Sequence, residues 1–213
     1  MTSGSILTIG HSTHDLADLI ELLRRHDVTA LADVRSVPAS RFAPQFNRGS
    51  VRSGLRDTGI GYVFLGKELG ARTDDTSCYV DGQVRYRRLA RTPEFRGGIG
   101  RLMNGARTER IALLCAEAEP LDCHRTVLVA RALTERGAAI GHIHADGQLE
   151  SHTDAMERLM SRFGLADPDL FRTPSERLAD ALRRQERRIA YVNEDYRGDR
   201  AEESWRRQLR GDS

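Results

Sequence analysis

The densest group of side chains that could do chemistry lies in the segment LLCAEAEPLDCHR, residues 113–125. If Asp122 caps a helix there, Cys123, His124 and Arg125 occupy its first turn. Basic side chains oppose the positive end of the helix dipole unless an anion binds the free N–H groups. The same position favours the thiolate form of Cys123. The segment therefore predicts an anion-binding helix start with Cys123 as a nucleophile; a packed cysteine beside a solvated His–Arg pair is the alternative.

The cysteines allow two further interpretations of this segment. Cys115, Cys123 and His124 offer two thiols and an imidazole, but no second C-x-x-C or histidine pair completes a four-ligand zinc set. We therefore predict no metal, and a redox disulfide between Cys115 and Cys123 is an alternative. With Cys78 the chain has three cysteines, which excludes a fully paired disulfide scaffold and favours free thiols in a reducing cytoplasm.

Further titratable residues follow other predicted strands. Asp33 and Arg35 alternate at the end of one apolar run and therefore share a face. His11, Asp33 or Glu117 could each act as a general base, while Ser12 and Arg35 could hold a substrate. The alternative for Asp33 and Arg35 is a structural ion pair.

The positive charge is concentrated locally. The chain has 33 basic and 31 acidic residues, and all basic residues except Lys67 are arginines, which a codon bias would also explain. Residues 35–56 nevertheless contain arginines and no acid. Within this stretch Arg41, Phe46 and Asn47 interleave a cation, an aromatic ring and an amide, which suits base stacking and phosphate binding. An apolar flap packed on the sheet is the alternative.

Short apolar runs alternate with amphipathic segments along most of the chain. Buried strands are predicted at residues 6–9, 30–34, 62–65, 110–115 and 139–143. The intervening helices are predicted to start at Thr13, at Asn47 or Ser50, at Pro93 and at Asp122. This order predicts an α/β fold: a mainly parallel sheet of about five strands with helices on both faces, in three layers. Ligands bind beyond the carboxyl ends of such strands, where the residues named above would converge.

The remaining segments differ in character. Residues 66–91 contain few apolar side chains and are expected to be irregular, forming a lid. We predict an α/β domain at residues 1–150 and a helical extension with a polar tail at 151–213. Pro174 opens a charged helix in this extension, and we expect that helix to be solvated rather than docked.

Several function classes are disfavoured. No run approaches the roughly 18 apolar residues of a membrane span, and the first residues lack a secretion leader pattern, so we expect a cytoplasmic protein without a membrane partner. The phosphate loop, the G-x-G-x-x-G dinucleotide motif and the G-x-S-x-G elbow are missing from the sequence. This disfavours common NTPases, dehydrogenases and esterases, and we predict no cofactor.

Four separated motifs occur in order along the chain. They are TIGHST at 8–13, DVRSVPASR at 33–41 with Phe46-Asn47, YVFLG at 62–66 with Leu69-Gly70, and LCAE at 114–117 with CHR at 123–125. Over about residues 5–150 they resemble a bacterial family called domain of unknown function 488, with Gly70-Ala71 departing where that family commonly has a second glycine. The resemblance implies a compact α/β domain with a polar rim; a nucleic-acid-processing role is suspected for the family, without an established reaction.

Together these features predict an enzyme that binds a phosphate-bearing substrate, a nucleotide or nucleic acid, at the carboxyl ends of the strands. The candidate catalytic residues are His11, Asp33, Glu117 and Cys123, and the candidate substrate-binding residues are Ser12, Arg35, Arg41, Phe46, Asn47, Tyr62, His124 and Arg125. One alternative is a non-catalytic module that binds nucleic acid or a protein. The other is a thiol redox protein that uses Cys115 and Cys123. The oligomeric state is left open.

Overall fold

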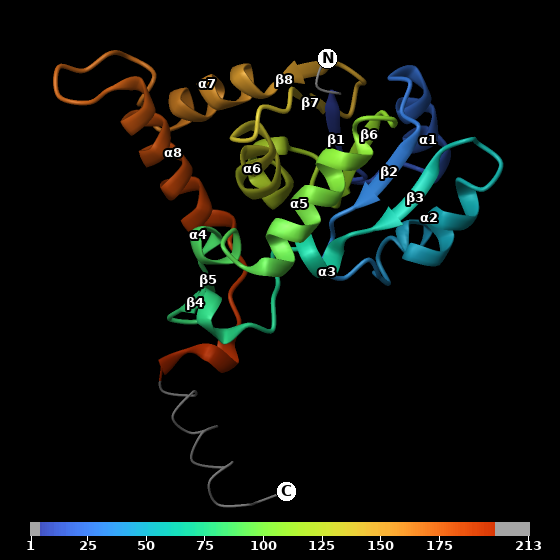
Figure 1. Ribbon diagram of the computed structural model, residues 1–213, viewed down its shortest axis with the longest axis horizontal. Coiled ribbons are helices and arrows are strands. Elements are labelled where there is room, and N and C mark those ends of the chain that lie inside the picture. The colour runs from blue at the N-terminus through green and yellow to red at the C-terminus, as the bar shows by residue number, and fades with distance from the viewer. Residues whose placement is uncertain (1–4, 199–213) are drawn as a thin grey trace, which may run out of the picture.

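A six-stranded sheet forms the centre of the structure, a computed structural model that describes residues 5–198. The strands lie in the order β3-β2-β6-β1-β7-β8 (Figure 1). Their bounds are Ile6–Gly10 for β1, Ala30–Asp33 for β2, Gly61–Phe64 for β3, Ile111–Cys115 for β6, Ile140–Ile143 for β7 and Leu149–Ser151 for β8. The first five are parallel, and β8 pairs antiparallel with β7.

The predicted α/β fold with a mainly parallel sheet is confirmed. Each of the five predicted strands is present, with bounds within one residue of those expected. The sheet also contains β8, a short strand without a buried apolar run to indicate it. Residues 66–91 are less irregular than expected, because β4 (Tyr79–Val80) and β5 (Gln83–Val84) form a hairpin there. Asp81-Gly82, with φ of 51° and 75°, makes its turn, and this dipeptide is a hairpin signal.

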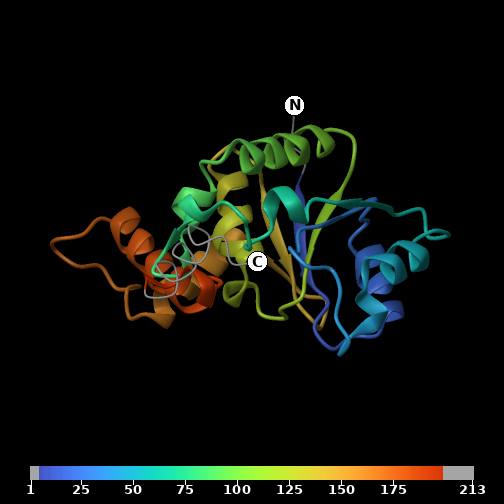
Figure 2. The same cartoon turned by 90° about the horizontal axis from the view of Figure 1, so that it is seen from below.

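Helices cover both faces of the sheet, because alternate strand residues point to opposite sides. On one face α1 (Leu16–Arg25) and α2 (Arg48–Gly54) pack on a core that includes Leu7 and Leu114. The other core includes Ile6 and Leu113 and is covered by α3 (Gly66–Leu69), α5 (Pro93–Gly105), the π-helix η4 (Arg125–Ala130) and α6 (Arg131–Thr134). Figure 2 shows the blue and cyan helices α1 and α2 on one side of the sheet and the green and yellow helices on the other.

The C-terminal part of the described chain adds α7 (His152–Arg162) and α8 (Pro174–Ile189), with the short α4 (Tyr86–Leu89) nearby (Figure 1). A capping box of Thr173 and Glu176 starts α8. The expectation that this charged helix is solvated is wrong. It buries Ala181 and Leu182 in the core, and Nε2 of Gln185 donates to the carbonyl of Leu121 at 2.8 Å. The polar tail beyond residue 198 lies outside the described residues.

Two predicted helix caps are also wrong. Asp15, rather than Thr13, precedes α1, and it makes no side-chain capping bond. Asp122 ends a 3-10 turn, and its carboxylate forms an ion pair with Arg162 at 2.5 Å instead of capping a helix. The helical turns begin at His124, so a tertiary contact has replaced the local cap. Among the helices of residues 5–198, none is long and apolar enough to cross a membrane.

Candidate active site

The carboxyl ends of β1, β2 and β6 meet at one edge of the sheet. Gly10 lies in register with Cys115, and Asp33 lies in register with Leu114. The pairing continues past the strands, because the N–H of His11 donates to the carbonyl of Cys115 at 2.9 Å. His11, Asp33 and Cys115 therefore stand at the edge where open parallel sheets bind their ligands.

A pocket of about 220 Å³ opens at this edge. Its lining combines residues that follow β2 and β6 with others from the 66–91 segment and the end of α8: Arg35, Ser36, Val37, Ala71, Arg72, Tyr86, Cys115, Ala116, Glu117, Asp122, His124, Ile189 and Tyr191. A larger hollow of about 730 Å³ lies beside α2 and β3, where Arg52 and Arg56 line it. Its lining holds none of the cysteine, histidine or glutamate candidates, so we place the candidate site at the smaller pocket.

Two glycines let the loops of the site approach each other closely. A Cβ on Gly10 would lie 1.8 Å from the carbonyl oxygen of Glu117. A Cβ on Gly66 would lie 2.0 Å from the carbonyl oxygen of Arg35. Because heavy atoms cannot approach so closely, any side chain at either position would push a loop of the site away from the strands.

The buried Asp33 and Arg35 and the half-buried Tyr62 form one polar cluster beside the pocket. Nε and Nη2 of Arg35 donate to the two carboxylate oxygens of Asp33, at 2.9 and 2.6 Å, and the hydroxyl of Tyr62 donates to Oδ2 at 2.8 Å. Burial acts to lower the pKa of Arg35, but the hydrogen bond and charge of Asp33 raise it overall. Burial and then the charge of Asp33 raise the pKa of Tyr62. The geometry therefore favours the structural ion pair between Asp33 and Arg35 over a role of Asp33 as a general base.

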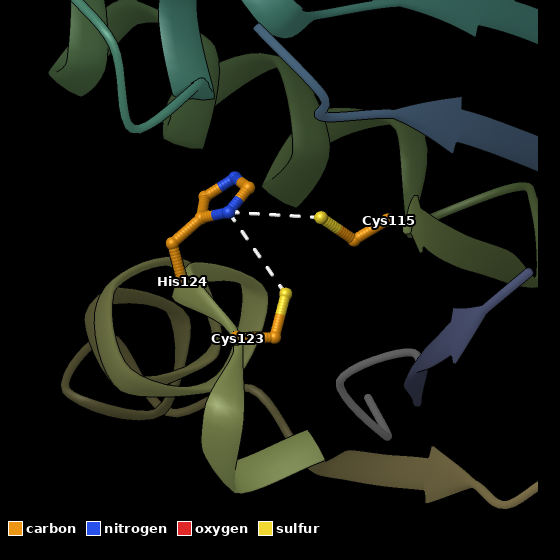
Figure 3. A group of neighbouring side chains, drawn as sticks. All are labelled: Cys115, Cys123 and His124. Atoms are coloured by element: carbon orange, nitrogen blue, oxygen red, sulfur yellow. Dashed lines mark hydrogen bonds between the residues drawn. The ribbon is translucent and has the colours of Figure 1, made fainter. Parts of the chain in front are cut away.

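Cys115, Glu117, Cys123 and His124 form a second cluster, called here the Cys–His–Glu cluster. Figure 3 draws the two cysteines and the histidine of this cluster. Oε2 of Glu117 lies 3.0 Å from Sγ of Cys115 and 2.9 Å from Sγ of Cys123. Nδ1 of His124 lies 3.6 and 3.9 Å from the same two sulfur atoms. Two thiols and an imidazole thus lie together in a buried space, and the more exposed Glu117 places its carboxyl group against both thiols.

Burial and mutual contact shift the titration of this cluster. Burial acts to raise the pKa of Cys123, but a hydrogen bond from Cys115 and the charges of Arg125 and His124 hold it well below its usual value. Burial, together with Cys123, raises the pKa values of Cys115 and Glu117. Burial opposes the charge on His124, yet contact with Cys123 raises its pKa overall. Of the two thiols, Cys123 is therefore the one whose deprotonation the surroundings favour, because the pKa of Cys115 is raised.

Arg125 is fully buried rather than open to the pocket. Its Nη1 and Nη2 donate to the carbonyls of Glu117 and Ala118 at 2.5 and 3.1 Å, and Nε donates to Thr8 Oγ1 at 3.4 Å. The predicted anion contact would need this guanidinium to leave its carbonyl partners. In the structure it holds the loop after β6 in place and supplies positive charge beside Cys123.

His11 and Ser12 lie at the end of β1, on the side of Phe46. The ring of His11 stacks on Phe46 with a centroid separation of 4.2 Å, and its Nδ1 donates to the carbonyl of Ser12 at 3.0 Å. Burial lowers the pKa of His11. Phe46 is only 1% exposed, so it supports His11 and offers no surface on which a ligand could stack.

Arg41 and Asn47 are not brought into the pocket lining. Nearby Phe42 is 91% exposed, with the guanidinium of Arg41 5.7 Å from its ring centroid. Oδ1 of Asn47 accepts from the backbone N–H of Ser40 at 2.7 Å and so shapes this loop. In this loop, the exposed aromatic ring on which a base could stack is therefore that of Phe42 rather than that of Phe46.

Several lining residues lie outside the candidate set derived from the sequence, among them Arg72, Tyr86 and Tyr191. Arg72 stacks on Tyr191, with 4.5 Å between its guanidinium carbon and the ring centroid, and Tyr86 lines the same pocket. Tyr86 lies in the polar segment 66–91, for which the sequence predicts a lid. In the structure Tyr86 is buried and forms part of the pocket wall. Tyr191 follows α8 and is brought to the pocket by docking of that helix, which no local pattern indicates.

The fold and site define an α/β protein with two buried cysteines and a histidine beside a more exposed glutamate at the carboxyl edge of its sheet. A family model, Domain of unknown function DUF488, matches residues 15–132, more than half of the chain, and the protein belongs to that family. The matched range includes the Cys–His–Glu cluster and Asp33, but not His11 or α8. No curated protein and no solved structure matches the chain.

Proposed function

We propose that the protein is an enzyme whose active site is the pocket at the carboxyl edge and whose substrate carries a phosphate or similar anionic group. One observation carries this proposal: Arg35, which follows β2, lines the same pocket as Cys115, Glu117 and His124, which lie at and after the end of β6. Clusters of titratable groups with shifted pKa values occur preferentially at sites of chemistry. The reacting centre in this proposal is the Cys–His–Glu cluster.

The anion contact is assigned to Arg35 and Arg72. Arg35 uses its Nε and Nη2 on Asp33, and Nη1 makes no hydrogen bond to any described residue. A guanidinium that is fixed along one edge presents its remaining N–H groups in a defined direction, which suits a tetrahedral anion. Arg72 lies across the same pocket, held against the ring of Tyr191.

The size of the pocket limits what it can enclose. Its volume of about 220 Å³ is below the range of about 300–1,000 Å³ that is usual for drug-sized ligands. It suits a phosphate group with the atoms next to it, while the rest of a nucleotide or nucleic-acid end would remain outside. The loop that leaves the pocket at Val37 carries the exposed ring of Phe42, which offers a stacking surface for a base.

The test is a turnover assay on the full chain with mononucleotides and with single-stranded oligonucleotides that carry terminal phosphates. We expect Cys123→Ser to remove turnover and Arg72→Gln to raise KM with a smaller effect on kcat. Arg107→Gln is the control, because Arg107 is exposed and lies outside the pocket lining. Salt-sensitive binding without turnover of any substrate would contradict the enzyme proposal and favour a nucleic-acid binding module.

A thiol redox protein is a second candidate, favoured by one specific observation. Both cysteine sulfurs contact the same oxygen of Glu117, and the donor atoms of Cys115, Cys123 and His124 all lie within 4.8 Å of one another. Mild oxidation would then join Cys115 and Cys123 and lower the mass of the chain by two hydrogens. If activity survives Cys115→Ser, this candidate is excluded.

A further inference from the structure

The Cys–His–Glu cluster has the composition and spacing of a metal-binding site. Donor atoms of Cys115, Cys123 and His124 lie within 4.8 Å of one another (Figure 3), and Glu117 places an oxygen next to both sulfurs. The sequence alone left this set one ligand short, because the fourth donor is a carboxylate rather than a third cysteine or a second histidine.

The sulfur–nitrogen distances agree with a tetrahedral ion. Bonds of about 2.3 Å to sulfur and about 2.05 Å to nitrogen would separate those two atoms by about 3.6 Å. The observed separations from Nδ1 of His124 are 3.6 Å to Cys115 and 3.9 Å to Cys123. A bound carboxylate oxygen would lie about 3.6 Å from each sulfur, so Glu117 would have to withdraw by only about 0.6 Å.

The surroundings orient the donors as metal sites require. Nε2 of His124 lies 3.0 Å from the carbonyl of Val34 and donates to it, which leaves the lone pair of Nδ1 directed at the two sulfurs. The backbone N–H of Arg125 points at Sγ of Cys123 at 3.4 Å, a contact that stabilises a thiolate. The first contact is to the backbone after β2 and the second is to the backbone of the same turn, so both hold the donors before any ion arrives.

We propose that Cys115, Cys123 and His124 bind a zinc-type divalent transition metal, with Glu117 as the fourth ligand. Two thiolates and an imidazole select borderline-soft ions and disfavour Mg²⁺ and Ca²⁺, which prefer all-oxygen sites. Binding requires both sulfurs as thiolates, so protons still held by the thiols are released to solvent. No oxidation or reduction is involved.

An ion can reach the cluster through the pocket at the carboxyl edge of the sheet. Cys115 is 2% and Cys123 1% exposed, so the ion would be shielded, yet Cys115, Glu117 and His124 all line the open pocket. A carboxylate is the ligand among the four that exchanges most readily for water or a substrate oxygen, which is the arrangement of catalytic rather than structural zinc sites. The inference does not rest on the proposed function, because a metal could bind here whatever the substrate is.

The test uses the full chain, purified under reducing, oxygen-free conditions, freed of metal with a chelator and titrated with Zn²⁺ and separately with Co²⁺. We expect about one ion per chain, and with Co²⁺ a sulfur-to-metal charge-transfer band together with the visible bands of a tetrahedral ion. Cys123→Ser and His124→Gln should weaken Zn²⁺ binding by more than the roughly 10–100-fold loss typical of changes outside the ligand shell.

The matched control is Cys78→Ser, because Cys78 is also a buried free cysteine but lies away from the cluster. It should bind Zn²⁺ as the unaltered chain does. If Cys123→Ser does not fold, thiol alkylation of the unaltered chain decides instead. Zn²⁺ should slow labelling of Cys115 and Cys123 but not that of Cys78. Absence of a sulfur-to-cobalt band, or equal protection of all three cysteines, would overturn the proposal.

Discussion

Acid should destabilise this protein through two neighbouring buried histidines, His142 on β7 and His152 at the start of α7. Nε2 of His142 lies 3.0 Å from Nδ1 of His152, and Nδ1 of His142 lies 2.9 Å from Thr8 Oγ1. Burial lowers the pKa of His142 to about 3, assisted by the positive charge of Arg125 and opposed by Glu150. Burial likewise lowers the pKa of His152 to about 4.

The size of the effect follows from proton linkage. Unfolded histidines titrate near pH 6.5, so between that pH and about 4 the unfolded chain binds protons that the folded chain excludes. At about pH 5, RT ln(1 + 10^1.5) gives about 2 kcal/mol for each histidine, or about 4 kcal/mol for the pair relative to about pH 7.5. The stabilisation is fully present above pH 6.5 and is lost as the pH falls towards the folded pKa values.

Urea unfolding measured at these two pH values tests this estimate. His152→Gln should remove about half of the pH-dependent loss, because one of the two titrating groups is gone. Each variant is its own control, since its stability at the higher pH records the cost of the substitution alone. If His152→Gln and His142→Gln both keep the full difference between the two pH values, the linkage to this pair is refuted.

Three further variants test the construction of the site. Arg125→Ala leaves two buried carbonyls unpaired and a cavity, so it should lower the free energy of unfolding by about 3–5 kcal/mol in urea titration; a loss below about 1 kcal/mol would contradict its role in holding the loop. Gly10→Ala places a methyl group against the carbonyl of Glu117 and should displace that loop. The free energy of Zn²⁺ binding, measured by titration, should therefore fall by more than the free energy of unfolding. Tyr62→Phe removes the hydroxyl bond to Asp33 and should cost about 1–3 kcal/mol, measured by the same titration, because a buried charge loses a donor.

The sheet could be predicted closely from the sequence because each parallel strand is a short, continuous apolar run. Ile111–Cys115, for example, is fully buried and is apolar at every position. Helix starts were less predictable, since a side chain that can cap a helix can also make a tertiary contact. Asp122 does so with Arg162 and Gln185, forty or more positions along the chain.

The sequence singles out Arg35, Glu117, Cys123 and His124 by their types, and the structure brings them together, but residue types alone do not give the distances between them. Seven residues separate Cys115 from Cys123, and only the folding back of that loop brings the two sulfurs to the same oxygen of Glu117. The loop folds back because Arg125 donates to two of its carbonyls. The sequence predicts that Arg125 contacts a ligand, whereas in the structure it is fully buried and holds the loop. The sequence pattern does not show whether such an arginine is buried.

The pocket is built from two parts of the chain that can change independently. Its titratable groups Arg35, Cys115, Glu117 and His124 come from the segment that the family model matches, whereas Ile189 and Tyr191, which line the same pocket, come from beyond it. Substitutions after α8 can therefore alter the shape of the pocket while Cys115 and Cys123 keep their contacts. One small cavity can thus combine side chains from the family-matched segment with wall residues that are specific to this protein and that shape which ligand it accepts.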